Sequence, residues 1–127
     1  MFTRPALTRP LLAGALVVAT LVGATACSTH AASEADLRSF ARCITKSGAR
    51  FYGAHWCGFC VRQKKMFGAA ADALPYIECY EPGTRNKLSK CASVTGFPRW
   101  VWPDGSEAPG LQSFEALAKA TGCSAPD

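Results

Sequence analysis

The feature that most constrains this chain is a pair of cysteines two residues apart, Cys57 and Cys60, between two different patterns. Before the pair, residues 50–53 have the character of a short strand. After it, apolar residues recur at helical spacing until Pro75. A cysteine at the start of a helix faces unpaired backbone N–H groups and the positive end of the helix dipole, which stabilise a thiolate. The pattern therefore predicts that Cys57 is a nucleophile and that Cys60, one turn later and deeper, closes a disulfide with it.

The rest of the chain alternates between helix and strand patterns. The expected elements are, in order, a helix from Ser33 to Gly48, a strand at 50–53, a helix from about Cys57 to Leu74, a strand at 76–80, a short helix at 86–94, a strand at 100–102, a short strand before Gly110 and a helix around 114–122. Pro109 in the fourth strand is compatible with a sheet edge. This order predicts an α/β, thioredoxin-like fold, with a central mixed four-stranded sheet flanked by helices and an extra N-terminal helix.

The N-terminal segment has the pattern of an export signal. Residues 1–26 combine a basic start, an apolar run and small residues before Cys27, which is typical of a signal peptide. A retained signal anchor is the alternative, although the apolar run is shorter than the ~20 residues of a membrane span. The small residues before Cys27 resemble the lipobox of bacterial lipoproteins, although Ala24 stands where Leu is more usual. We expect lipidation at Cys27, with plain secretion as the alternative, a tether at 27–33 and one domain at 34–127.

Composition limits the possible functions further. The chain has 127 residues and seven cysteines, a count that indicates an oxidising compartment or a metal. It carries 14 Lys+Arg against 9 Asp+Glu, not gathered in one block, so nucleic acid is not an expected partner. With Cys27 set aside, an even number of cysteines remains.

The Cys57–Cys60 pair also admits a metal interpretation. Structural zinc needs four ligands, yet the sequence has no second C-x-x-C, and its histidines are His30 and His55. Copper held by the two thiolates stays open, so a copper-binding chaperone is the alternative from a different class. An inert bridge is less favoured, because so short a loop adds little stability. No metal and no cofactor other than the redox-active disulfide is expected.

Longer motifs indicate which group of thioredoxin-like domains the sequence resembles. They are FYGAHWCGFC at 51–60, RQKKMFG at 62–68, LPYIEC at 74–79, GFPRW at 96–100, GLQS at 110–113 and Leu117-Ala118. Together they resemble the thioredoxin-like domain associated with vitamin K epoxide reductase homologues of bacteria and plastids, over about residues 43–123. Gly58-Phe59 stands where that family often has Pro-His, which leaves the reduction potential open. Phe51 replaces the acid that ordinary thioredoxins bury, which disfavours a cytosolic-type reductant.

The resemblance implies roles for further residues. It implies a cis-proline at Pro98 opposite the cysteine pair, and a substrate-binding surface formed by Trp56, Phe59, Phe97 and Pro98. It also implies a structural disulfide between Cys79 and Cys91, with a second redox pair that relays electrons as the alternative. Cys43 and Cys123 are the two cysteines that remain once these pairs and Cys27 are set aside, so they are a further candidate for a disulfide. His55 is expected to shape partner contacts, or to stabilise the Cys57 thiolate when protonated.

The leading functional hypothesis is an exported thiol–disulfide oxidoreductase on the periplasmic side of the bacterial cytoplasmic membrane. By resemblance, it forms disulfides in exported proteins that contain cysteines. A membrane vitamin K epoxide reductase-like enzyme, or another quinone-linked oxidoreductase on a separate chain, then reoxidises it. A membrane-tethered reductant using the same chemistry in reverse is the alternative.

Overall fold

The computed structural model describes residues 31–127, so the predicted signal peptide at 1–26 and the lipidation at Cys27 lie outside the described residues. The sheet has four strands: β1 (Arg50–Gly53), β2 (Tyr76–Glu78), β3 (Arg99–Val101) and β4 (Glu107–Pro109). Its order is β2-β1-β3-β4, with β1 parallel to β2 and antiparallel to β3, and with β3 antiparallel to β4. The predicted mixed four-stranded sheet is confirmed, and Pro109 lies on its edge strand.

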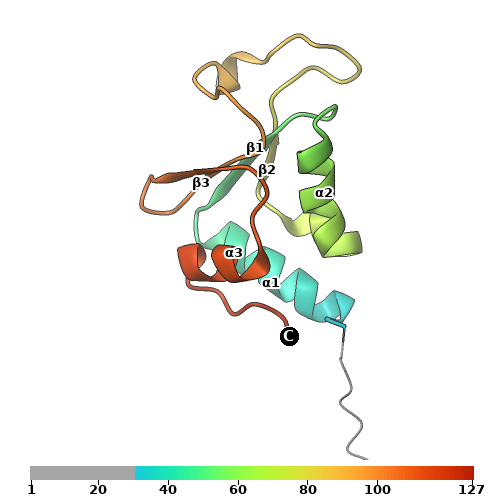
Figure 1. The fold of residues 1–127 in the computed structure, drawn as a ribbon, viewed down its shortest axis with the longest axis vertical. Helices are drawn as coiled ribbons and strands as arrows, with labels where there is room; N and C mark the ends of the chain where they lie inside the picture. The colour runs from blue at the N-terminus through green and yellow to red at the C-terminus, as the bar shows by residue number, and fades with distance from the viewer. Residues whose placement is uncertain (1–30) are drawn as a thin grey trace, which may run out of the picture.

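Three α-helices flank the sheet: α1 (Glu34–Lys46), α2 (Gly58–Phe67) and α3 (Phe114–Thr121) (Figure 1). Serine side chains cap the N-termini of α1 and α3, where Ser33 Oγ accepts from Asp36 N and Ser113 Oγ accepts from Ala116 N. Gly122 ends α3 with φ 73°, a left-handed conformation that glycine adopts without steric cost. α1 is the expected extra N-terminal helix.

The structure departs from the predicted elements at three places. The helix after the cysteine pair ends at Phe67, where Gly68 turns to φ 52°, and the chain continues as the 3-10 helix η1 (Gly68–Ala73). The predicted strand at 76–80 ends at Glu78. The helix predicted at 86–94 is wrong: only the 3-10 turn η2 (Ser89–Cys91) forms there, because a disulfide and a bridge between Tyr80 and Lys87 fold the segment back on itself.

The core lies between the sheet and the helices and is largely aromatic. Phe51 of β1 stacks on Trp100 of β3, with ring centroids 4.6 Å apart. Phe40 of α1 stacks on Phe67 of α2, and both meet Phe114 of α3 edge-on. Stacked and edge-on aromatic pairs add stability beyond the area that they bury. These contacts fix α2 against the sheet and so fix where its first residue lies.

Within residues 31–127, we find no helix with the length and apolar character that a membrane crossing requires.

Candidate active site

The predicted cysteine pair lies where β1 ends and α2 begins. Cys57 is the N-cap of α2, and its Sγ accepts a hydrogen bond of 3.3 Å from the backbone N of Cys60. Its backbone N donates to Ala54 O at 2.9 Å, which holds the loop between strand and helix. Cys57 is 7% exposed and Cys60 is 1% exposed, so the first sulfur is the more accessible of the two. The Cys60 N–H at the start of α2, which would stabilise a Cys57 thiolate, therefore already points at its sulfur.

Cys60 lies in a tight space between β1, β2 and α2. A Cβ added to Gly53 would lie 3.1 Å from Cys60 Sγ, 3.0 Å from Tyr76 Oη and only 2.4 Å from Tyr76 Cε2. Glycine at this position therefore lets the Tyr76 ring and the Cys60 sulfur border the same point. Burial, followed by the interaction with the Cys57 thiol, raises the pKa of Cys60 to about 12. Cys60 thus keeps its proton at neutral pH until a reaction step removes it.

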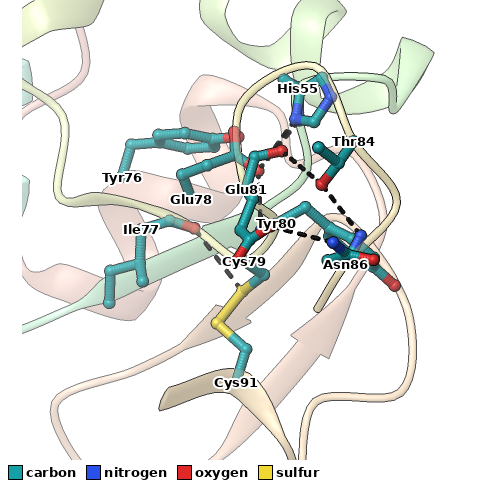
Figure 2. A network of polar contacts seen from close by, with 10 residues as sticks. All are labelled: His55, Tyr76, Ile77, Glu78, Cys79, Tyr80, Glu81, Thr84, Asn86 and Cys91. Carbon is teal, nitrogen blue, oxygen red and sulfur yellow. Dashed lines mark hydrogen bonds and ion pairs between the residues drawn. A yellow bond between two sulfur atoms is a disulfide. The ribbon is translucent and has the colours of Figure 1, made fainter. Parts of the chain in front are cut away.

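A polar network lies behind the pair and joins β2 to the loop before α2 (Figure 2). The Glu78 carboxylate accepts from Tyr76 Oη at 2.8 Å and from the backbone N–H groups of His55 and Tyr80, both at 3.1 Å. Burial alone would raise the pKa of Glu78, but these hydrogen bonds outweigh it and hold the pKa below its usual value. Glu78 therefore stays ionised and ties the loop that carries the cysteine pair to the sheet.

Two further side chains, Lys64 and His55, interact with this network. Lys64 of α2 places Nζ 3.2 Å from the centroid of the Tyr76 ring, and burial lowers the pKa of Lys64. Burial, and then the hydrogen bond to Glu78, raises the pKa of Tyr76. His55 turns its Nδ1 toward Glu78, 3.6 Å from Oε1, so its imidazole takes part in this network.

The four residues predicted to bind substrate lie around Cys57 in different ways. Trp56 and Phe59 are 39% and 55% exposed, whereas Pro98 is buried and the Phe97–Pro98 peptide bond is cis. The rings of Trp56, Tyr80 and Phe97 meet edge-on, with centroids 5.2 to 6.4 Å apart. They border a groove of about 340 Å³ that opens beside Cys57 and is lined further by Lys87 and by Val94 to Gly96. Trp56 and Phe97 line this groove, whereas Phe59 and Pro98 do not, and the role of these four residues in substrate binding stays a prediction.

The other cysteines in the described region are bonded. Cys79 is joined to Cys91 and Cys43 to Cys123, with Cα–Cα distances of 5.5 and 5.9 Å. The first bond fixes the segment from Tyr80 to Val94, which forms one wall of the groove. The second joins α1 to the chain after α3. Cys57 and Cys60 are free, and their thiols are the soft donors that the copper alternative would use.

Three residues near the pair were not predicted to act there, namely Lys64, Tyr76 and Glu78. They are polar residues within helix and strand patterns, and only the parallel pairing of β1 with β2 brings Tyr76 beside Cys60 and Glu78 beside the loop before α2. Elsewhere in residues 31–127, no three side chains of His, Cys, Asp or Glu gather as a metal site would need.

The mixed sheet, the Cys-x-x-Cys pair at the first turn of a helix and the cis peptide at Phe97–Pro98, whose Phe97 lines the same groove as Cys57, are typical of the thioredoxin-like class of fold. The chain is similar to thiol-disulfide oxidoreductase LTO1 of Arabidopsis thaliana, with 38% identity over 92 residues, covering 68% of this chain and 24% of that protein. The chain therefore spans about a quarter of the length of that relative. No family model matches the chain.

Proposed function

We propose that this protein is a thiol–disulfide oxidoreductase whose redox centre is the Cys57–Cys60 pair. One observation carries the proposal. In the described part of the chain, four cysteines are locked in disulfides, and the two free ones stand together at the start of a helix beside an open groove. The similarity to a plant thiol-disulfide oxidoreductase supports the same chemistry.

The reaction exchanges one disulfide for another. In the oxidising direction, a substrate thiolate attacks Cys57 of the bonded pair and forms a mixed disulfide, and Cys60 leaves and takes up a proton. A second substrate thiolate then attacks the substrate sulfur of the mixed disulfide and releases Cys57. Two electrons and two protons pass from the substrate to the pair, and the substrate gains a disulfide. In the reducing direction every step is reversed, and Cys60 resolves the mixed disulfide.

We further propose that the protein works after export and mainly oxidises. The signal-peptide pattern at 1–26 and the lipobox-like residues before Cys27 support a lipid-anchored location on the periplasmic side of the cytoplasmic membrane. The two disulfides in the folded domain fit an oxidising compartment. By resemblance, a quinone-linked membrane oxidoreductase of the vitamin K epoxide reductase type accepts the two electrons. The substrates are exported proteins with cysteines.

The test is disulfide transfer from the purified, oxidised protein to a reduced peptide with two cysteines. We expect one peptide disulfide per protein molecule, with the loss of the Cys57–Cys60 bond and retention of the other two, read by mass spectrometry. A variant with Cys57→Ser should transfer none. Equilibration of the pair with glutathione buffers then separates an oxidant from a reductant. Stoichiometric copper in the reduced protein, without transfer, would favour the chaperone instead.

The proposed anchor has a separate test. Replacing Cys27 with Ser should release the protein from the membrane fraction or leave the signal peptide uncleaved. A wild-type protein found in the soluble periplasmic fraction, with an unmodified N-terminus, would favour plain secretion. Neither result affects the chemistry proposed for Cys57 and Cys60.

A further inference from the structure

The segment from Tyr80 to Val94, here called the stapled loop, projects beyond the sheet on the side away from α1 and α3 (Figure 1). The Cys79–Cys91 disulfide closes its base, and both cysteines are fully buried. Backbone bonds from Glu81 N to Asn86 O (3.0 Å) and from Leu88 N to Cys79 O (2.8 Å) hold its two sides together. The side chains that it presents are therefore preorganised rather than ordered only on binding.

Two cations of the stapled loop are held at the groove beside Cys57. The Arg85 guanidinium lies over the Trp56 ring, 4.3 Å from its centroid. A guanidinium stacked on its face keeps its N–H edge free to donate two parallel hydrogen bonds to a carboxylate. Lys87 lines the groove, and its Nζ donates to Val94 O at 2.6 Å, which fixes its position without neutralising its charge.

Neither Arg85 nor Lys87 takes part in any of the ion pairs within residues 31–127. The acid on the same loop, Glu81, is engaged with Asn86 Nδ2 at 3.0 Å (Figure 2). Arg62, which lies 5.3 Å from the centroid of the Phe59 ring, adds a third unpaired cation beside the cysteine pair. The surface around Cys57 therefore combines an aromatic groove with a positively charged edge.

We propose that Arg85 and Lys87 make the stapled loop a specificity element, selecting extended substrate segments that carry an acidic residue close to the reacting cysteine. The inference rests on the proposed function, because it names the substrate class of that same site. The groove is at the small end of ligand sites, which fits a short stretch of chain. The aromatic rings contact the apolar part of that stretch, and the carboxylate meets the Arg85 edge.

The experiment compares three reduced peptides that differ only in a residue two positions from one cysteine, which is Glu, Gln or Lys. The measured quantity is the second-order rate constant of their oxidation by the oxidised protein. We expect the order Glu, Gln, Lys, with about 1.4-fold to fivefold between successive peptides, the range of exposed charge pairs. The differences should shrink in 1 M salt, where the screening length falls to about 3 Å.

Variants at Arg85, which is exposed, test whether this residue causes the preference for the Glu peptide. Arg85→Glu should reverse the preference, and Arg85→Lys should keep only part of it, because lysine retains the charge but not the two parallel hydrogen bonds. The matched control is Lys119→Glu, the same reversal of charge on an exposed residue of α3, which should leave the preference unchanged. Intact disulfides, read by mass, show that each variant is folded.

The outcomes separate this inference from the proposed function. Equal rates for all three peptides in the wild-type protein would overturn the specificity element and leave the oxidoreductase standing. If the protein oxidises none of the peptides, the proposed function itself is overturned, and with it the specificity element that rests on it. If the peptides are oxidised equally, while Arg85→Glu abolishes sedimentation with phosphatidylglycerol vesicles, the charged edge binds a lipid surface, and the substrate proposal is overturned.

Discussion

At the scale of single residues, Gly53, Tyr76 and the Cys60 sulfur pack closely against one another. Gly53 has no side chain, and this absence allows Tyr76 and Cys60 to share the space beside β1. The buried Cys60 thiol then has a pKa far above its usual range, while Cys57 offers its sulfur to the groove. The division of roles proposed for the two cysteines therefore follows from which of them is more enclosed.

A side chain at Gly53 should disturb this packing. In Gly53→Ala, the added Cβ would lie 2.4 Å from Tyr76 Cε2, so the ring must shift and weaken its hydrogen bond to Glu78. We expect a loss of about 1–3 kcal/mol in the free energy of unfolding, the usual range for overpacking. Gly58→Ala is the control, because nothing lies within 4 Å of a Cβ there. Denaturant unfolding measures both, and equal stability of the two variants would contradict the packing argument.

The two thiols should also differ in reactivity. With its pKa raised to about 12 and its sulfur enclosed, Cys60 should remain unmodified in the reduced protein near neutral pH. Cys57 should then be alkylated first by iodoacetamide, and peptide mapping at short times identifies the labelled residue. Cys60 labelled ahead of Cys57 would show that the assignment of roles is wrong.

At the scale of elements, the network around Glu78 joins β2 to the loop that begins α2. Because the pKa of Glu78 is held below its usual value in the folded protein, Glu78 binds fewer protons there than in the unfolded chain. Its contribution to stability is therefore full above its unfolded pKa and is lost as the pH falls through its lower folded pKa. His55 N and Tyr80 N would then face a protonated acid.

The variant Glu78→Gln tests this contribution. At pH 7 we expect it to lower the free energy of unfolding by about 1–2 kcal/mol, in keeping with hydrogen bonds to a charged group. The gap between wild type and variant should narrow as the pH falls from about 5 to 3. A gap that is constant over that range would show that the Glu78 charge does not contribute. Thermal or denaturant unfolding at several pH values provides the measurement.

The elements also show what could be predicted from the sequence. The β1–Cys57–α2 junction, the order of elements and the caps of α1 and α3 follow from local patterns, because each depends on residues close in the chain. Residues 86–94 of the stapled loop were predicted as a helix, because the periodicity of these residues does not reveal how a disulfide across the base of the loop constrains the backbone. Tyr76 and Glu78 reach the site through sheet pairing, which the sequence does not specify for individual side chains.

The Cys79–Cys91 disulfide at the base of the stapled loop should resist reduction more than the Cys57–Cys60 disulfide does. Cys79 and Cys91 are fully buried, so a thiol reductant should reach them after it reaches Cys57–Cys60. Replacing both with Ala should cost ~3 kcal/mol by the chain-entropy model. Titration with a dithiol buffer, with each pair mapped by mass, gives the order of reduction. Reduction of both pairs at one potential would favour the electron-relay interpretation over a structural one.

At the scale of the whole molecule, the fold encloses Cys60 and leaves Cys57 at the wall of the groove. The Cys43–Cys123 disulfide joins α1 to the chain after α3. Neither cysteine lines the groove, so this disulfide does not obstruct Cys57. The stapled loop, the loop before α2 and the cis peptide at Phe97–Pro98 converge on the groove from three parts of the chain. This arrangement brings residues from three parts of the chain to the groove that Cys57 lines.

Trapping of the mixed disulfide tests the central claim most directly. In Cys60→Ala, the resolving thiol is absent, so an intermediate with a substrate should persist. We expect this variant, incubated with a peptide disulfide, to form a covalent adduct that maps to Cys57 and is released by reductant. The matched Cys57→Ala variant should form no such adduct. Adducts on Cys60 in the Cys57→Ala variant, with none on Cys57 in the Cys60→Ala variant, would contradict the account.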